Sequence, residues 1–494
     1  MRIAIVNAPS RARVYGPLTD LAAIELPVWG AILAAYLGKL GHDVTLVDAE
    51  MEGWTAGETA ACVEELRPDL AVFPVYGQQP SASTQCLPGA ERVARLLTCP
   101  TLCFGTHPSA LPERTLREGP WTYVAEGEGH RTIAVLLAAK DGVNATMVPG
   151  LYSRLGPTAI MVPGRHNDPG IVGDLDVELP SRGFLRFDFR RYRAHNWHAF
   201  GYASRSPYAS LQTSLGCPFR CSFCCINAPF GGSGIRFWSA ENVLEHFRQL
   251  AERGVTHVKV PDEMFLLNPL HVEAICDGLI EMRGWAFNIW AYARVDTCVD
   301  DRLLAKLKRA GFNWLGIGIE SASEHVRDGV EKGRFGAEDI VASVKRVRAH
   351  GIAVGANYIF GLPDDTRATM QETLDLACEL NTEWANFYCA MAYPGSALYG
   401  EAKKLGWPLP DDAGGPGWIG YAQHAYETLP LPTVTMSAAE VLAFRDAAFH
   451  EYFERPTYWS MLVRKFGQNA VRDVHAMTAH RLKRKLLENK EITT

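Results

Sequence analysis

The 494-residue sequence lacks long hydrophobic runs, a marked excess of either charge and a regular cysteine spacing. No apolar stretch approaches the roughly 18 residues that a membrane-spanning helix needs. The net charge of −6 provides no basic surface of the kind that binds nucleic acid. The N-terminus has neither the apolar core nor the cleavage site of a signal peptide. We therefore expect a cytoplasmic protein that binds neither nucleic acid nor a membrane.

Hydrophobic residues make up 47% of the chain and charged residues 21%, as in soluble globular proteins with a large core. The length is too great for one ordinary domain. The pattern along the chain predicts four parts, at residues 1–145, 146–207, 208–405 and 406–494. The second part is rich in Gly, Pro, Arg and aromatic residues, which indicates an ordered connector.

The first part alternates apolar strands with amphipathic helices. Its predicted strands are 2–8, 43–49, 70–76, 100–105 and 122–127. Continuous apolar strands separated by helices predict a doubly wound parallel sheet of flavodoxin or Rossmann type. Such sheets bind ligands beyond the carboxyl ends of their strands. No Gly-x-Gly-x-x-Gly fingerprint follows the first strand, so a dinucleotide is not indicated. A domain that binds nothing, or another small cofactor, stays an alternative.

The third part begins a second β-α series. Its predicted strands are 208–214, 257–263, 286–294, 314–321, 354–361 and 384–393. Six units are too few for the eight of a closed TIM barrel, so we expect a partial (β/α)6 barrel with an open side. The fourth part turns from loops to helices with many aromatic residues.

Most of the twelve cysteines lie singly in apolar segments, but LGCPFRCSFCC brings four together. Cys217, Cys221 and Cys224 have a spacing with which one short loop can wrap an iron–sulfur cluster. Such clusters usually take four cysteines, so three leave one iron open. A structural zinc site normally closes all four positions, and Cys225 cannot readily join its neighbour on one metal face. Buried or zinc-binding cysteines stay the alternative.

This segment resembles the radical S-adenosylmethionine (SAM) superfamily, whose signature is Cys-x3-Cys-x-aromatic-Cys, with Phe223 as the aromatic residue. The resemblance implies a [4Fe–4S] cluster whose open iron binds the amino and carboxylate groups of SAM. It also implies reductive cleavage of SAM to methionine and a 5′-deoxyadenosyl radical. An electron donor such as a flavodoxin or ferredoxin would be a partner.

Further positions resemble the superfamily's secondary motifs at consecutive strand ends. The resemblance assigns contacts with SAM to Asp262 and Glu263 at the end of the second strand, and to Arg294 and Asp296 after the third. It assigns others to Gly318, Glu320 and Ser321 on the fourth strand, and to Ile359 and Gly361 on the fifth. Ile359 would lie against the adenine. Each motif is weak alone, because a Gly-rich strand end is usually only a tight turn.

The first part resembles the cobalamin-binding domain of one large subgroup, the methyltransferase-like class B enzymes. The resemblance assigns cofactor loops to Tyr76, Gly77, Gly105, Thr106, His107, Glu126, Gly127 and Glu128. The Asp-x-His-x-x-Gly motif, which supplies a cobalt ligand in other cobalamin proteins, is absent. We therefore expect His107 to have a structural role.

The subgroup implies methylation of an unactivated carbon, or of phosphorus, on a small molecule or peptide through methylcobalamin and the adenosyl radical. A non-methylating rearrangement or cyclisation is the first alternative. The second is a cobalamin sensor or carrier with a vestigial cluster. Methylthiotransferases differ, because their first domain carries a second cysteine set. His195, His198, His424, Arg445 and Tyr452 are candidates for the substrate pocket, with a core or surface location as the alternative.

Overall fold

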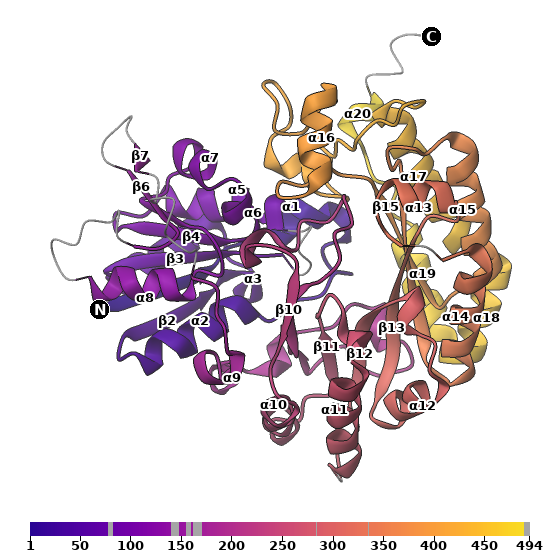
Figure 1. The fold of residues 1–494 in the computed structure, drawn as a ribbon, viewed down its shortest axis with the longest axis horizontal. Coiled ribbons are helices and arrows are strands. Elements are labelled where there is room, and N and C mark those ends of the chain that lie inside the picture. Colours follow the sequence, from indigo (N-terminus) through magenta and orange to yellow (C-terminus); the bar gives the residue numbers. More distant parts are fainter. Residues whose placement is uncertain are drawn as a thin grey trace.

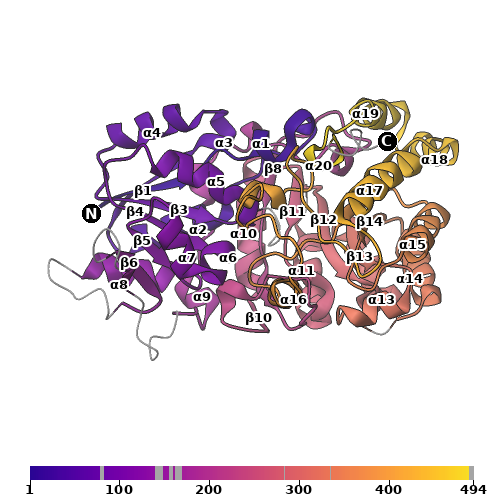
Figure 2. The same ribbon diagram turned by 90° about the horizontal axis from the view of Figure 1, so that it is seen from above.

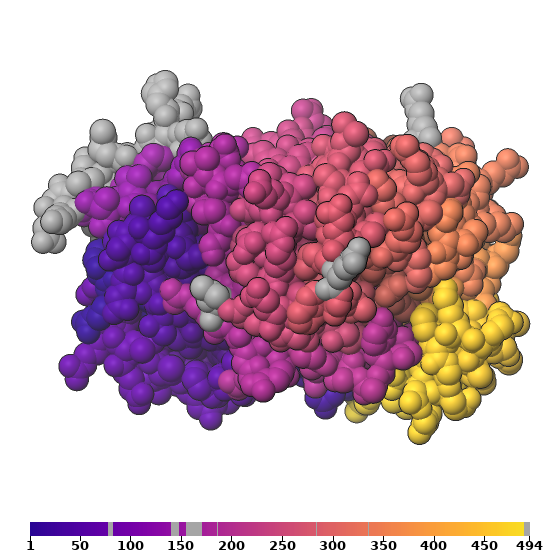
Figure 3. All heavy atoms as spheres, turned by 90° about the horizontal axis from the view of Figure 1, so that it is seen from below, coloured from indigo at the N-terminus to yellow at the C-terminus, as the bar shows by residue number. Residues whose placement is uncertain are grey.

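The computed structural model describes residues 1–77, 83–139, 148–154, 160–161, 170–282, 284–333 and 335–488. Two parallel sheets lie side by side, one in the N-terminal domain and one in a partial barrel (Figure 1). The C-terminal helices lie at the far end of the barrel from the N-terminal domain, as the lower face of the molecule shows (Figure 3). None of the described helices is both long and apolar enough to cross a membrane.

The N-terminal sheet has the strand order β2-β1-β3-β4-β5-β6-β7. All five predicted strands are present and parallel, as β1 Arg2–Asn7, β2 Asp43–Asp48, β3 Leu70–Val75, β4 Thr101–Gly105 and β5 Tyr123–Ala125. An antiparallel edge of β6 Leu151–Arg154 and β7 Ile160–Met161 follows, which the sequence pattern did not indicate. The order 2-1-3 makes β1 and β3 neighbours at the switch point, where doubly wound sheets bind ligands.

Helices cover both faces of this sheet, as the alternation of side chains along β1 requires. Ile3 and Ile5 pack with α2 and α8, whereas Ala4 and Val6 pack on the opposite face with α4, α5 and α7. The helices of the domain are α1 Arg11–Tyr15, α2 Val28–Lys39, α3 Ala49–Glu52, α4 Ala56–Glu65, α5 Ser83–Ala94, α6 Thr106–Ala110, α7 Pro112–Glu118 and α8 His130–Ala138. The predicted doubly wound fold is therefore confirmed.

The barrel sheet has six parallel strands in sequential order, which confirms the predicted partial barrel. The strands are β8 Tyr208–Ser210, β11 His257–Val260, β12 Asn288–Arg294, β13 Phe312–Glu320, β14 Ala353–Phe360 and β15 Trp384–Cys389. The helices are α10 Ala240–Glu252, α11 Pro269–Glu281, α12 Asp301–Arg309, α13 Glu324–Gly329, α14 Ala337–Ala349 and α15 Arg367–Leu380. The sheet does not close, so β8 and β15 are its two edges.

The first predicted barrel strand, 208–214, differs from the structure. The chain leaves the sheet after β8 and forms a separate hairpin, in which β9 Ser214–Cys217 pairs antiparallel with β10 Gly234–Phe237. The Asp262 carboxylate anchors the departure by accepting hydrogen bonds from Thr213 N at 2.8 Å and Thr213 Oγ1 at 2.6 Å. Gly216 has φ +91°, and a Cβ there would overlap the carbonyl oxygen of Gly234. This close approach explains why a glycine precedes the first cysteine.

The predicted connector, 146–207, divides into two described parts: its first part forms the β6–β7 edge of the N-terminal sheet, and residues 170–207 pack against both sheets. It contains α9 Leu175–Glu178 and three short 3-10 turns, η4 Phe184–Arg186, η5 Phe189–Arg191 and η6 Trp197–Ala199. Trp197 lies among the rings of Trp290, Trp314 and Trp384, with centroid separations of 5.1–6.1 Å. These tryptophans lie near the starts of β12, β13 and β15, so Trp197 fills the amino end of the barrel.

After β15 the chain crosses back to the N-terminal domain and then forms a helical lobe (Figure 2). The crossing segment, residues 406–437, contains η10 Trp418–Tyr421 and meets α7 through an ion pair between Arg114 and Asp411. The helices around it are α16 Ala397–Leu405, α17 Ala438–Phe453, α18 Pro456–Phe466, α19 Gln468–Thr478 and α20 Lys485–Glu488.

Trp197→Ala is expected to destabilise the barrel by about 3–5 kcal/mol, because it removes a buried ring and leaves a cavity among three other tryptophans. Urea unfolding followed by circular dichroism measures the change. Trp285→Ala serves as the control, since Trp285 is 48% exposed and its removal leaves no cavity. Equal midpoints for the two variants would contradict the packing role of Trp197.

Candidate active site

The three cysteines of the motif lie on the loop that follows β9. Cys217 ends that strand opposite Gly234, and the loop continues through Cys221 and Cys224. Ser222 N donates a hydrogen bond of 3.0 Å to Val330 O, and Leu398 N donates one of 2.8 Å to Ser222 O. The cysteine loop is therefore fixed between the end of α13 and the start of α16.

Burial raises the pKa of all three thiols, to about 11 for Cys217. The positive charges of Lys332 and Arg294 act in the opposite direction on Cys221. All twelve cysteines are free. No three His, Cys, Asp or Glu side chains of the described residues are placed to hold a single metal ion. A multi-iron cluster spreads its thiolate ligands over several metal atoms, and coordination deprotonates the thiols.

Arg294, at the end of β12, stacks on the cysteine loop. Its guanidinium lies 3.9 Å from the ring centre of Phe219 and donates to Asp296 at 3.0 and 3.1 Å and to Lys332 O at 2.7 Å. Glu320, at the end of β13, accepts a 2.5 Å hydrogen bond from Lys332 Nζ, and both side chains are nearly buried. The predicted residues Arg294, Asp296 and Glu320 therefore lie on one side of the cysteine loop.

The backbone around Glu320 is unusual. The residue has φ +66°, and the pairing of β13 with β14 shifts register between Gly318 and Glu320. A Cβ on Gly318 would lie 2.6 Å from Glu320 Oε1 and 2.8 Å from Lys332 Nζ. The glycine at 318 is thus required for the Glu320–Lys332 pair to form in this position.

Phe223 and Ile359 anchor the loop from another side. Both pack against a buried cluster of Val326, Val330, Leu362 and Ala390. Two other predicted residues have local structural partners. Gly361 has φ +80° and donates its N–H to Asp365, while Ser321 is fully buried beside Thr373 Oγ1 at 3.2 Å.

Asp262 and Glu263 follow β11 and have different surroundings. Asp262 is buried and accepts hydrogen bonds from Thr213 and Ser214, so it supports the strand that leads to Cys217. Glu263 has no hydrogen bond or ion pair with the described residues. Burial and the neighbouring charge of Asp262 raise the pKa of Glu263 to about 8. An unpartnered, partly desolvated carboxyl group at a strand end is suited to contact a ligand.

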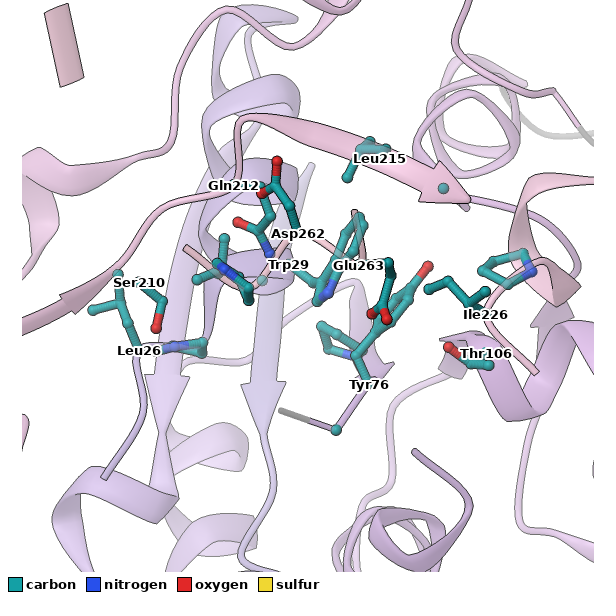
Figure 4. A pocket seen from close by; sticks show the side chains of 18 of the residues that line it. Leu26, Trp29, Tyr76, Thr106, Ser210, Gln212, Leu215, Ile226, Asp262 and Glu263 are labelled. Carbon is teal, nitrogen blue, oxygen red and sulfur yellow. The ribbon is translucent and has the colours of Figure 1, made fainter. Parts of the chain in front are cut away.

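Glu263 projects into a cavity between the two sheets, which we call the central cavity (Figure 4). One wall comes from the N-terminal domain, with Asn7 at the end of β1, Tyr76 after β3 and Thr106 after β4. The opposite wall comes from β9, the end of β11 and the segment after the cysteines, which includes Ile226. The carboxyl edges of both sheets therefore face one space.

The predicted loop residues Tyr76, Gly77 and Thr106 line the central cavity. Tyr76 stacks on Trp29 with ring centres 4.3 Å apart, and its hydroxyl is buried without a hydrogen-bond partner among the described residues. Gly105 has φ +129°, and a Cβ there would overlap the Val75 carbonyl. The side of the central cavity formed by β3 and β4 thus combines an aromatic pair, close backbone packing and an unsatisfied polar atom.

The other predicted loop residues do not line the central cavity. His107 is fully buried, meets Thr84 Oγ1 at 3.1 Å and stays neutral, because burial lowers its pKa to about 3. Glu126 accepts a hydrogen bond from the Tyr152 hydroxyl at 3.1 Å, and Gly127 N donates to Ser109 Oγ at 3.0 Å.

Glu128 lies at the boundary between the domains. It is fully buried and forms an ion pair of 2.5 Å with Arg236 of β10. It also accepts a hydrogen bond of 2.6 Å from Val172 N.

A second cavity, the inner cavity, shares Asn7, Tyr76 and Gly77 with the first. Tyr15, Glu25 and His195 also line it, so His195 reaches a cavity as its aromatic-rich segment suggested.

Two other candidates for the substrate pocket, His198 and Tyr452, are fully buried in the core. The sequence reasoning assigned no role to Trp29, Phe219 or Lys332. Trp29 lies within residues 27–50, which resemble part of a cobalamin-binding domain, and Phe219 lies within the cysteine motif, whereas Lys332 lies in no recognised motif.

Comparison with known proteins agrees with this geometry. The Radical SAM superfamily model matches residues 211–377. An uncharacterized methyltransferase of Pyrococcus horikoshii is 28% identical over 408 residues, covering 81% of this chain and 82% of that protein. An anaerobic magnesium-protoporphyrin IX monomethyl ester cyclase of Rubrivivax gelatinosus is 25% identical over 406 residues, covering 77% and 67%.

Among solved structures, the radical SAM methyltransferase TsrM of Kitasatospora setae, with cobalamin and a [4Fe–4S] cluster bound, has a TM-score of 0.68 at 17% identity. The likeness covers 96% of this chain and 99% of that one, so it includes both sheets and the C-terminal helices. The segment that contains the cysteine loop and most of the barrel, residues 211–377, therefore matches the radical SAM superfamily, and the chain as a whole shares its fold with a methyltransferase solved with cobalamin and a [4Fe–4S] cluster bound.

Proposed function

We propose that the protein is a cobalamin-dependent radical SAM methyltransferase that methylates an unactivated carbon, or phosphorus, of a small molecule or peptide. One observation carries the proposal. The central cavity is lined both by the switch point of the doubly wound sheet and by the end of β11 beside the cysteine loop. A methyl carrier on the first wall and SAM on the second would meet the same substrate, which such a reaction requires.

The residues present fit these cofactors. Cys217, Cys221 and Cys224 would hold the cluster, with Arg294 and Lys332 supplying positive charge beside it. Glu263, Arg294, Asp296, Glu320 and Ile359 would bind SAM, and the Trp29–Tyr76 side of the central cavity would hold the corrin. When bound, these groups supply a one-electron reductant, a source of a carbon radical and a transferable methyl group. A flavodoxin or ferredoxin would supply the electron.

The chain itself orients the cofactors and excludes water. Leu26, Leu215 and Ile226 give the central cavity apolar walls, and a radical in such surroundings is shielded from side reactions with solvent. Gln212 Oε1 is buried without a hydrogen-bond partner among the described residues and lies on the same wall as Glu263. These two oxygen-bearing side chains are available to orient a polar ligand.

A second candidate is a non-methylating radical reaction, favoured by the relative named as a cyclase. Anaerobic reconstitution with cluster and cobalamin, followed by mass analysis of candidate substrates, separates the two. Methyl transfer predicts a product heavier by one methylene group, together with S-adenosylhomocysteine and 5′-deoxyadenosine. Deoxyadenosine without S-adenosylhomocysteine would favour the cyclisation or rearrangement. A protein that binds cobalamin but no iron or sulfide would favour a sensor.

Replacing Cys217, Cys221 and Cys224 with Ala is expected to abolish the binding of iron and sulfide, because the cluster loses all its thiolate ligands. Formation of deoxyadenosine should be lost with the cluster. Cobalamin binding, followed by its visible absorption, should persist because the other wall of the central cavity is unchanged. Cys225→Ala is the matched control, since it removes the adjacent buried thiol and should keep the cluster. Loss of the cluster in the control alone would contradict the assignment.

Gly318→Ala is expected to raise the KM for SAM roughly tenfold, because a Cβ there displaces Glu320 and Lys332 at an overpacking cost of about 1–3 kcal/mol. Deoxyadenosine formation against SAM concentration measures the effect, and iron content should stay constant. In Gly355→Ala, on the next strand, the nearest atom lies 4.0 Å from the new Cβ, so activity should change little. An unchanged KM in Gly318→Ala would remove Glu320 from the SAM site.

A further inference from the structure

A third cavity, the outer cavity, lies between the N-terminal loop and the C-terminal helices. Leu18 of the 3-10 turn η1 Gly16–Leu18, Phe449 of α17 and Met477 of α19 give it an apolar lining. Its polar lining includes Arg445, Asp446, His450 and Arg481. None of these residues belongs to the cysteine loop or to the central cavity.

The charge of the outer cavity is locally positive, although the chain carries −6 overall. Asp446 pairs with two arginines, Arg445 at 2.8 Å and Arg484 at 2.8 Å, so two positive charges lie beside its one negative charge. Arg445 donates through Nε to Phe387 O and through Nη1 to Asp446, and its Nη2 makes no hydrogen bond with the described residues. Arg481 lines the cavity and meets Glu454, which is not part of the lining, at 3.0 Å.

One pair of rings separates the outer cavity from the inner cavity. Tyr15 lines the inner cavity, His424 lines the outer one, and the two rings stack with centres 5.7 Å apart. The Nδ1 atom of His424 is buried without a hydrogen-bond partner among the described residues. The inner cavity in turn shares Tyr76 and Gly77 with the central cavity. The three cavities thus form a series that leads from the C-terminal helices toward the proposed reaction site.

We propose that the outer cavity is the anion-binding end of the substrate site, and that the Tyr15–His424 pair is the partition between it and the inner cavity. The ligand class is a small molecule with an apolar body and one carboxylate or phosphate group. The apolar side chains accept the body, and Arg445 Nη2 and Arg481 supply charged donors for the anion. This proposal rests on the proposed function, because only that function makes the ligand a substrate. Binding of an anion to the outer cavity can be tested without turnover.

Binding of small probes to the full chain tests the anion site. Benzoate and phenyl phosphate are the anionic probes, benzamide is the uncharged probe of similar shape, and saturation-transfer NMR or calorimetry measures their affinities. The proposal predicts that at least one anion binds about tenfold more tightly than benzamide, since hydrogen bonds to charged groups are the stronger ones. Whichever anion binds better identifies the chemical group. Equal binding of all three probes, or none, would overturn it.

Arg481→Gln is expected to weaken binding of the better anion about tenfold, because it removes a charged donor. Arg472→Gln is the matched control, since Arg472 lies exposed on α19 outside the cavity lining. Arg445→Lys keeps a positive charge but loses Nη2, so it should weaken the anion more than benzamide. Unchanged anion affinity in both Arg481→Gln and Arg445→Lys would contradict the proposal.

The partition has its own measurement. Biphenyl-4-carboxylate is too long for one small cavity. Tyr15→Ala removes one ring of the partition and opens the inner cavity, so it should raise the affinity for biphenyl-4-carboxylate several-fold relative to the affinity for benzoate. Tyr426→Ala, which removes a 43% exposed ring from the crossing segment that carries His424, should leave the ratio of the two affinities unchanged. An unchanged ratio in Tyr15→Ala would overturn the partition.

The two proposals fail in different ways. If the protein binds the anionic probe but forms neither S-adenosylhomocysteine nor a methylated product, the methyltransferase assignment fails and the anion site stands. If SAM is cleaved and methyl transfer occurs, but Arg481→Gln and Arg445→Lys change neither probe binding nor the KM of the methylated substrate, the anion site fails alone.

Discussion

Two buried ion pairs hold the carboxyl edges of the two sheets against a common space. Glu25, from the segment before α2, meets Lys259 of β11 at 3.1 Å, and both side chains are 2% exposed. Tyr208 and Ser210 donate to the same Glu25 carboxylate at 2.5 and 2.8 Å. Such a pair contributes little net stability, because desolvation offsets its attraction, but breaking it leaves an uncompensated buried charge. It therefore restricts how the two domains are oriented.

The second pair links the same interface to the cysteine loop. Arg236 stands on β10, whose partner β9 ends at Cys217, and it pairs with the fully buried Glu128 of the N-terminal domain. The strand that supports the first cysteine is thus attached to the domain proposed to hold the corrin. Since hydrogen bonds and ion pairs fix both partners, a shift of one domain would also move the cysteine loop. The separation of the two proposed cofactor sites is consequently set by the interface.

Local sequence signals predicted the fold well. Apolar strands and intervening helices identified the five parallel strands of the first sheet and all six of the barrel, because each signal lies within one short segment. The β9–β10 hairpin was missed because its pairing depends on the contact of Gly216 with Gly234, which lies beyond the cysteine loop. Lys332 was missed for a similar reason. It contributes to the site because its Nζ lies close to Glu320, and it belongs to no motif of its own.

The candidate site was predictable to the extent that its residues follow strand ends. Tyr76 and Thr106 come directly after β3 and β4, Glu263 comes three residues after β11, and all three line the central cavity. The Glu126–Glu128 loop also follows a strand, β5, but its side chains bond to Tyr152 and Arg236 instead. A strand end fixes where the backbone goes, whereas the direction of a side chain depends on partners from remote segments.

The same reasoning indicates where substrate selectivity originates. Cofactors at both carboxyl edges would cover most of the central cavity, so the remaining walls must come from elements outside the two sheets. The C-terminal region supplies the walls of the outer cavity, and Asp446 ties α17 to the start of α20 through Arg484. The crossing segment joins it to the N-terminal domain where Asp411 accepts hydrogen bonds from Tyr399, Tyr421 and Arg114. A ligand that orders these side chains would therefore also stabilise the domain interface, which couples substrate binding to the alignment of the two cofactor sites.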